Sequence, residues 1–245
     1  MRGLKLIQTI NLNKWVVVFT QRDKTKANDF LQNMQKVCPP MGIQLSRPTM
    51  LDLPDDNNNT FLRAIAAGVN RETQVVVVVL PTNRKDRYDA VKKYLCIDHP
   101  VPSQCVVGRT LGKKNLMSIV TKIAIQINIK LGGQAWSLEI PLQGLMVCGV
   151  DTYHDSQVKG RSVAALVCSL NRACTRYYSK ITFQHTHQEL SDGLRINLTA
   201  ALKKYHEVNG TLPDRIILYR DGVGDGQLQA VYEHEIPQLL ECFNQ

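Results

Sequence analysis

The sequence has 245 residues, 44% of them hydrophobic and 21% charged, which is typical of a folded protein with one large or two ordinary domains. It holds no apolar run of roughly 18 residues or more, so a membrane-spanning helix is not expected. The formal net charge of +9 is concentrated in residues 1–134, so this half is expected to attract a polyanion such as nucleic acid, a solvated basic surface being the alternative.

The first half alternates β-branched runs with amphipathic ones. The pattern predicts strands at 15–20, 43–51, 74–81 and 103–107, and helices at 26–42, 60–70, 86–96 and 115–133. The valine run within 74–81 is typical of a strand buried on both faces of a parallel sheet. Strands that alternate with helices in this way predict a doubly wound α/β sheet.

The second half has a different order of elements. Strands are expected at 145–151, 161–170 and 176–184, which favours an antiparallel meander. A helix at 189–210, a strand at 215–221 and a helix at 226–243 follow, with Pro237 as a candidate break in the last helix. We place the domain boundary near residues 133–141, which gives domains of 1–135 and 136–245.

Two aspartates follow apolar strands of the second half, Asp151 after LMVCGV and Asp221 after RIILYR. If these strands pair side by side and parallel, both carboxylates emerge at the same edge of the sheet, where α/β sheets place their ligands. Two oxygen ligands there suit Mg²⁺, which supports phosphodiester hydrolysis. The alternative is that each aspartate caps the turn or helix that follows it.

The glycines after Asp221, in the stretch YRDGVGDGQ, raise the question of a phosphate-binding loop. They do not form a GxGxxG fingerprint, and no lysine with a hydroxyl residue follows as in a P-loop. We therefore interpret them as a tight turn behind a metal-binding carboxylate.

In the first half, the helix around YDAVKKYLC places Tyr88 and Lys92 four residues apart on one face, and Gln104 begins the next strand. The long helix that follows presents Gln126 and Lys130 on one face. Lysines, an amide and an aromatic ring can together bind a terminal phosphate and stack its base. Spacing alone equally allows a solvated helix face.

The motifs taken together are similar to those of the Argonaute family, in its Piwi clade. They are NRKDRYDAVKKYLC, PSQCVVGRTLGKKN, TKIAIQINIKLGG, GVDTYHD, HQELSDGL and YRDGVGDGQL, spread from about residue 13 to the C-terminus in the family's order. The resemblance implies a Rossmann-like MID domain with a parallel sheet, followed by an incomplete RNase H-like PIWI domain.

The resemblance implies that the MID domain binds the 5′ end of a small guide RNA. By position, Tyr88 stacks on the first base, and Lys92, Gln104 and Lys130 hold the 5′ phosphate. Many Argonautes have a lysine where this chain has Gln126, and a bound Mg²⁺ with the Gln126 carbonyl as a ligand would replace that charge. The segment 82–87 matches the one that inspects the first base, usually a uridine.

The second half resembles an RNase H-like slicer that depends on Mg²⁺ or Mn²⁺. Asp151 and Asp221 match its two metal-binding aspartates, and Glu189 matches the glutamate that completes the site, although an exposed first-turn helix residue is the alternative reading of Glu189. The family's fourth catalytic group, a histidine, belongs further along the domain than Gln245. The chain is therefore expected to be part of a larger protein and, by itself, not to cleave RNA.

The implied function is silencing of transposons in germ cells by a piRNA guide, through a complementary target RNA and recruited silencing-factor proteins. The implied location is cytoplasmic germ granules or the nucleus, with no membrane partner. One rival is a non-catalytic module that binds a guide and recruits effectors. Another is a doubly wound protein that binds a small nucleotide or sugar phosphate, which would not prefer a 5′-phosphorylated RNA to a mononucleotide.

Overall fold

The computed structural model describes residues 4–154, 162–184 and 193–243, and it divides into two compact units, Met1–Trp136 and Ser137–Gln245. The division falls inside the stretch 133–141 where a boundary was expected. No helix in the described part of the chain combines the length and the apolar character that crossing a membrane requires.

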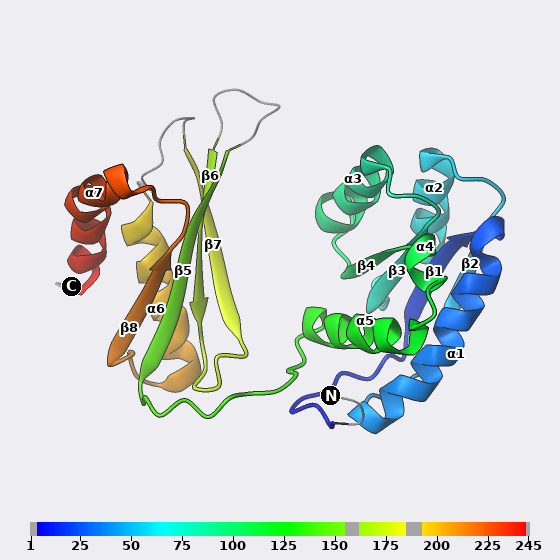
Figure 1. Cartoon of the computed structure of the whole chain (residues 1–245), viewed down its shortest axis with the longest axis horizontal. Helices are drawn as coiled ribbons and strands as arrows, with labels where there is room; N and C mark the ends of the chain where they lie inside the picture. Colours follow the sequence, from blue (N-terminus) through cyan, green and yellow to red (C-terminus); the bar gives the residue numbers. More distant parts are fainter. Residues whose placement is uncertain (1–3, 155–161, 185–192, 244–245) are drawn as a thin grey trace. The chain divides into compact units, whose positions relative to one another are not determined.

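The N-terminal unit is built around a four-stranded sheet with the order β2-β1-β3-β4, in which every neighbouring pair is parallel (Figure 1). Its elements are β1 (Trp15–Thr20), α1 (Lys24–Met41), β2 (Thr49–Leu53), α2 (Asn58–Gly68), β3 (Val75–Leu80), α3 (Lys85–Lys93), β4 (Ser103–Val107), α4 (Gly108–Leu111) and α5 (Leu116–Lys130).

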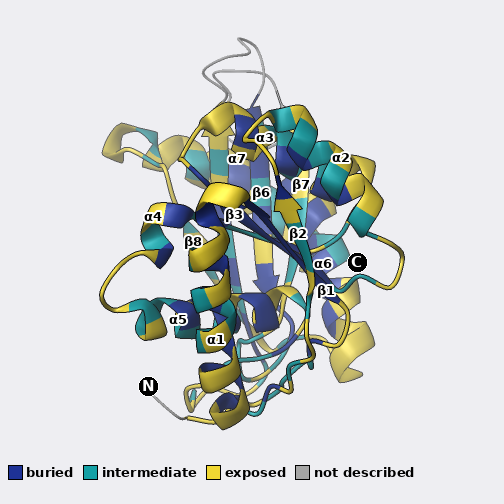
Figure 2. Ribbon diagram, turned by 90° about the vertical axis from the view of Figure 1, so that its right-hand side faces the viewer, coloured by how far each residue is buried: buried dark blue, intermediate teal, exposed yellow. Residues whose placement is uncertain are grey.

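Alternate side chains of the central strands supply two separate cores. Val17 and Val77 pack with residues of α1 and α5, whereas Val16 and Val76 pack with residues of α2 and α3, and all four valines are buried. Successive side chains of a strand point to opposite faces, so a strand made only of apolar residues needs a helix layer on each side. Figure 2 shows the central strands β1 and β3 in the colour of buried residues, and the predicted doubly wound sheet is confirmed.

The strand β2 is the element of this unit whose start differs most from the prediction. The helix α1 spans both Pro39 and Pro40, as the predicted helix 26–42 does, and its cap residue Gly42 adopts a left-handed conformation with φ of 89°. Prolines in the last turn of a helix are tolerated here because the buried residues Cys38 and Met41 keep that turn packed on the core. The strand β2 begins only at Thr49, after Pro48, and not at residue 43.

The C-terminal unit has a second four-stranded sheet, with the order β7-β6-β5-β8. Its elements are β5 (Leu145–His154), β6 (Ser162–Ser169), β7 (Tyr177–Gln184), α6 (Leu194–Asn209), β8 (Arg215–Arg220) and α7 (Leu228–Leu240). The strands β5, β6 and β7 are antiparallel as predicted, and β8 pairs with β5 in parallel. The helix α6 packs on one face of the sheet through Leu198, Ala201 and Tyr205.

Two further predictions for this unit need correction. The strand β5 does not end at Asp151 but continues to His154, because the antiparallel pairing with β6 extends that far. The helix α7 is not broken at Pro237, which lies inside it.

Candidate functional site

Three elements of the N-terminal unit bring the five residues expected to bind a guide together. Tyr88 and Lys92 lie on α3, Gln104 lies on β4, and Gln126 and Lys130 lie on α5. The helices α3 and α5 run antiparallel to the strand β4 that lies between them in the sequence. The end of α3, the start of β4 and the end of α5 therefore meet. This place is the amino end of β4, not the carboxyl edge at which α/β sheets usually bind ligands.

Ser103, the first residue of β4, joins the two lysines. Lys92 Nζ donates to Ser103 Oγ at 2.8 Å and to the Ser103 carbonyl oxygen at 3.3 Å. Lys130 Nζ donates to the same carbonyl oxygen at 2.8 Å and to Gln104 Oε1 at 2.7 Å. We call these six residues, Tyr88, Lys92, Ser103, Gln104, Gln126 and Lys130, the lysine–glutamine cluster.

The cluster has a surplus of positive charge. Burial, and next the charge of Lys92, hold the pKa of Lys130 below its usual range. Within residues 4–154, 162–184 and 193–243, neither lysine forms an ion pair with a carboxylate. Two ammonium groups held on one carbonyl oxygen without a counter-charge are electrostatically unfavourable, and an anion that reaches both relieves their repulsion.

Tyr88 offers an aromatic surface beside this charge. The residue is 44% exposed, and Lys92 Nζ lies 5.9 Å from the centre of its ring. An exposed ring next to a cation can stack a nucleobase while the cation holds the attached phosphate.

The amide oxygen of Gln126 is the candidate ligand for a divalent cation in the cluster. Its Oε1 accepts a hydrogen bond from Gln104 Nε2 at 3.2 Å, so an amide oxygen lies inside the cluster. One neutral oxygen beside two ammonium groups cannot hold Mg²⁺ alone, but Mg²⁺ takes most of its ligands from water and phosphate oxygens. The residues therefore fit a cation that arrives with a phosphate group.

Asp151 and Asp221 are adjacent in the C-terminal unit. The parallel register of β5 and β8 pairs Val150 with Arg220, and the backbone N–H of Asp221 donates to the Val150 carbonyl oxygen at 3.0 Å. A Cβ atom built on Gly222, the residue after Asp221, would lie 3.7 Å from Asp151 Oδ1. The parallel pairing on which the two-aspartate prediction depended is therefore present.

Each of these carboxylates is exposed, and each accepts one local hydrogen bond. Asp151 Oδ1 accepts from the N–H of Thr152 at 2.7 Å, and Asp221 Oδ1 accepts from the N–H of Gly222 at 2.8 Å. Two exposed hard oxygen donors side by side fit Mg²⁺ or Mn²⁺. No group of three or more potential metal ligands occurs in the part of the chain that the structure describes, and Glu189 lies outside the described residues.

A buried ion pair supports the turn that carries Asp221. Arg220 Nε and Nη2 donate to the two carboxylate oxygens of Glu235 on α7, at 2.8 and 3.1 Å, and Arg220 Nη1 donates to the Asp221 carbonyl oxygen. The side chain of Glu235 is only 2% exposed. The pair fixes α7 to the end of β8 and so holds the backbone at Asp221.

Sequence reasoning missed Ser103, Arg220 and Glu235. Ser103 precedes Gln104 in the motif SQC, but the contact that it shares with both lysines is through its backbone carbonyl, which no residue type reveals. A glutamate on a helix is usually solvent-exposed, so its residue type gives no sign of a structural role. The structure shows that Glu235 is the buried residue of α7.

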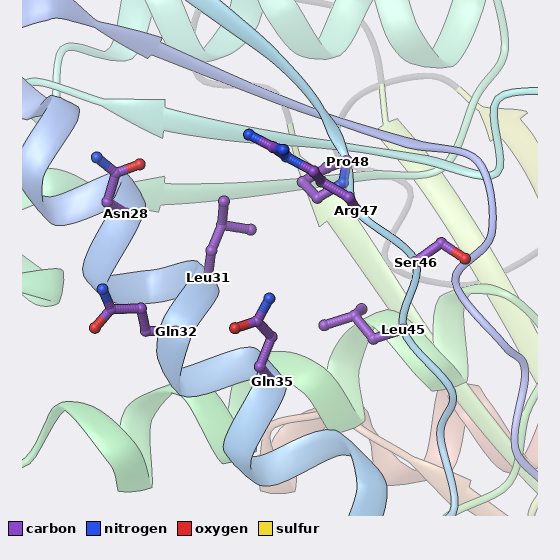
Figure 3. A pocket seen from close by; sticks show the side chains of 8 residues that line it. All are labelled: Asn28, Leu31, Gln32, Gln35, Leu45, Ser46, Arg47 and Pro48. Carbon is purple, nitrogen blue, oxygen red and sulfur yellow. The ribbon is translucent and has the colours of Figure 1, made fainter.

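A separate pocket lies between α1 and the segment before β2 (Figure 3). It has a volume of about 420 Å³, and Figure 3 shows the side chains around it, which are Asn28, Leu31, Gln32, Gln35, Leu45, Ser46, Arg47 and Pro48. It shares no residue with the lysine–glutamine cluster.

Comparison with known proteins agrees with this arrangement. The Piwi domain family matches residues 75–245. The chain is 51% identical to Piwi-like protein 1 of Danio rerio over 98% of its own length and 28% of that protein, and 46% identical to Piwi-like protein Ago3 of Bombyx mori over 97% and 26%. It thus spans little more than a quarter of these relatives.

Solved structures share the fold. The crystal structure of Drosophila Piwi superimposes with a TM-score of 0.89 at 31% identity, over 98% of this chain and 33% of that one. Kluyveromyces polysporus Argonaute, solved with a guide RNA, superimposes with a TM-score of 0.79 at 20% identity, over 99% and 30%, which shows the fold alone. The predicted α/β architecture, with a parallel sheet followed by an RNase H-like unit, is confirmed. The chain belongs to the Piwi family of Argonaute proteins.

Proposed function

We propose that this chain binds the 5′-phosphorylated end of a small guide RNA through the lysine–glutamine cluster. The observation that carries the proposal is the pair of ammonium groups of Lys92 and Lys130, which share the Ser103 carbonyl oxygen and have no carboxylate partner in the described residues. A terminal phosphate supplies the missing negative charge and several acceptor oxygens at once. Family membership supports the choice of guide RNA as the phosphate's source.

Each member of the cluster has a distinct role in this proposal. Lys92 and Lys130 donate charge-assisted hydrogen bonds to the phosphate, and Gln104 adds a neutral donor. Tyr88 stacks on the first base. Gln126 would hold a Mg²⁺ ion through its carbonyl oxygen, and the ion would supply the positive charge that a lysine at this position provides in many other Argonautes.

Matched RNA oligomers test the proposal. A 5′-phosphorylated guide should bind more tightly than the same guide with a 5′-hydroxyl, and far more tightly than a nucleoside monophosphate. Equal affinities for the phosphorylated and hydroxyl guides would refute the cluster as a phosphate site. Equal affinities for the oligomer and the mononucleotide would favour the rival small-nucleotide protein.

We further propose that, in a protein extended to the length of its relatives, Asp151 and Asp221 hold Mg²⁺ or Mn²⁺ and cleave a target RNA paired to the guide. A bound metal ion would stabilise charge on the attacking and leaving oxygens. The two aspartates supply oxygen ligands from adjacent strands, Asp151 from within β5 and Asp221 from directly after β8, and the Arg220–Glu235 pair keeps the end of β8 in place. Glu189 is proposed to complete the site.

The extended protein also distinguishes a slicer from the non-catalytic alternative. Asp151→Asn removes a carboxylate without changing the size of the side chain, so it should abolish cleavage and weaken Mn²⁺ binding while guide affinity stays unchanged. The proposed biological role is piRNA-guided transposon silencing in germ cells, in cytoplasmic germ granules or the nucleus. Silencing that survives Asp151→Asn would instead favour recruitment of silencing-factor proteins without cutting.

A further inference from the structure

A buried arginine lies directly before the aromatic residue of the cluster. Arg87 ends the segment 82–87, which leads from β3 into α3, and its side chain is only 1% exposed. Arginine is almost never fully buried unless it is paired, because removal of a charge from water is costly. The partners of Arg87 therefore show what this burial accomplishes.

These partners come from a turn that is distant in the sequence. Arg87 Nε donates to Asn58 Oδ1 at 3.2 Å, and Arg87 Nη2 donates to the Asp56 carbonyl oxygen and lies 3.4 Å from Asp56 Oδ2. The guanidinium group also lies 5.4 Å from the centre of the Phe61 ring. Arg87 thus attaches the segment 82–87 to the beginning of α2.

Asn58 makes a second attachment to the same segment. Its Nδ2 donates to Asp86 Oδ2 at 3.0 Å, so one amide side chain accepts from Arg87 and donates to Asp86. Asp86 in turn accepts from Arg84 Nε at 3.1 Å and from Arg84 Nη2 at 2.7 Å. These bonds, first from Arg84 and next from Asn58, hold the pKa of Asp86 well below its usual range. The segment is therefore fixed at Arg84, Asp86 and Arg87.

The position of this network determines its consequence. Tyr88 follows Arg87 in the first turn of α3, so a base stacked on Tyr88 has the segment 82–87 as its neighbour. Backbone N–H and C=O groups of such a neighbour can hydrogen-bond the edge of the base, but they discriminate between bases only if they are held in place.

We propose that Asn58 and Arg87 are positioning residues that set the preference for the first base of the guide, without touching that base. The inference rests on the proposed function, because it requires the first base to stack on Tyr88. A rigid segment presents one arrangement of donors and acceptors, and a released segment adapts to any base. Mere stabilisation of the fold would instead change the affinity for all guides by the same factor.

The test measures the affinity of four 5′-phosphorylated guides that differ only in their first base, each beside its 5′-hydroxyl form. Asn58→Ala removes the two hydrogen bonds that Asn58 makes to the segment, at the first residue of α2, where alanine is well tolerated, and leaves the contacts of Arg87 with Asp56 in place. Asn59→Ala is the matched control, since it makes the same change one residue along the same helix. The preference is expressed as the ratio of the tightest to the weakest affinity.

We expect the preference to fall about two- to tenfold in Asn58→Ala, the range that corresponds to one or two hydrogen bonds, and to stay unchanged in Asn59→Ala. The ratio between 5′-phosphate and 5′-hydroxyl guides should stay unchanged in both. Asn58→Asp keeps the acceptor for Arg87 but places a carboxylate against Asp86, so it should give an intermediate preference. It also carries the test if Asn58→Ala lowers the melting temperature severely.

An unchanged preference in both Asn58 variants, or a wild-type protein that binds all four guides equally, would overturn the inference. These results differ from failure of the proposed function, which is loss of the phosphate requirement in the wild-type protein. Both ratios come from the same set of titrations. The first-base ratio tests the inference about Asn58 and Arg87, and the phosphate ratio tests the proposed function.

Discussion

The charge of Lys92 can be removed without disturbing the buried core of the N-terminal unit. Lys92→Ala deletes an ammonium group that bonds to Ser103 Oγ and lies above the Tyr88 ring, while the half-buried stem faces the cluster. Lys93→Ala, one residue along α3, removes the same charge from an exposed position outside the cluster. The two variants therefore separate a direct phosphate contact from general attraction of RNA.

The expected magnitude follows from the geometry. A hydrogen bond to a charged group contributes about 1.5–3 kcal/mol, which corresponds to a loss of roughly 10- to 150-fold in affinity. Lys92→Ala also removes a positive charge that is the second cause, next to burial, of the lowered pKa of Lys130. Lys130 then binds the phosphate more favourably, which offsets part of the loss in affinity. We therefore expect Lys92→Ala to weaken guide binding about 10- to 30-fold.

The assay is a filter-binding titration at about 150 mM salt, where exposed charges more than about 8 Å apart are largely screened. Under these conditions Lys93→Ala should weaken binding about threefold or less. The loss in Lys92→Ala should be confined to the 5′-phosphorylated guide and almost absent with the 5′-hydroxyl guide. Equal losses in the two variants, or equal losses for the two guides, would refute the reasoning.

Three further predictions concern the metal ion, the pH dependence and the buried ion pair. Chelation with EDTA should weaken wild-type binding of the phosphorylated guide, and Gln126→Lys should restore affinity and remove this sensitivity; identical titrations with and without Mg²⁺ would contradict the cation. Affinity should rise as the pH passes about 6, where the phosphate becomes dianionic, and should fall at alkaline pH below the ordinary lysine value of 10.5, because the lowered pKa of Lys130 makes it lose its proton early. Lys130→Arg should remove this alkaline decline. A wild-type affinity that stays constant at alkaline pH would contradict the prediction. Glu235→Ala removes the carboxylate that pairs with the mostly buried Arg220 and should lower the free energy of unfolding by about 3–5 kcal/mol in urea denaturation. Glu241→Ala, which removes an exposed ion pair, should cost about 1 kcal/mol or less, so equal costs would count against the buried pair.

The sequence predicted the elements well wherever a local pattern determines them. Runs of valine identified β1 and β3, and helical spacing placed Tyr88 and Lys92, and likewise Gln126 and Lys130, on common faces. The prediction of a helix break at Pro237 was wrong. Pro237 lies inside α7, because a residue type reports the cost of a helix position but not the packing that offsets it.

Spacing alone left the candidate sites undecided, because it could not distinguish a binding face from a solvated one. The resemblance to Argonautes selected the residues, and their roles stay predictions until guide and metal binding are measured. The structure shows that the five residues of the N-terminal unit meet, and that Asp151 and Asp221 follow paired positions of β5 and β8.

The sequence by itself determined the α/β class, the change of pattern between the two halves and the identity of the candidate residues. Periodicity and motif spacing are local properties, and a single chain displays them directly. Only the tertiary structure decided that Ser103 joins Lys92 to Lys130 and that Asn58 fixes the segment before Tyr88. These contacts depend on strand register and helix packing between residues far apart in the chain, and their partners are often backbone atoms, which every residue type carries alike.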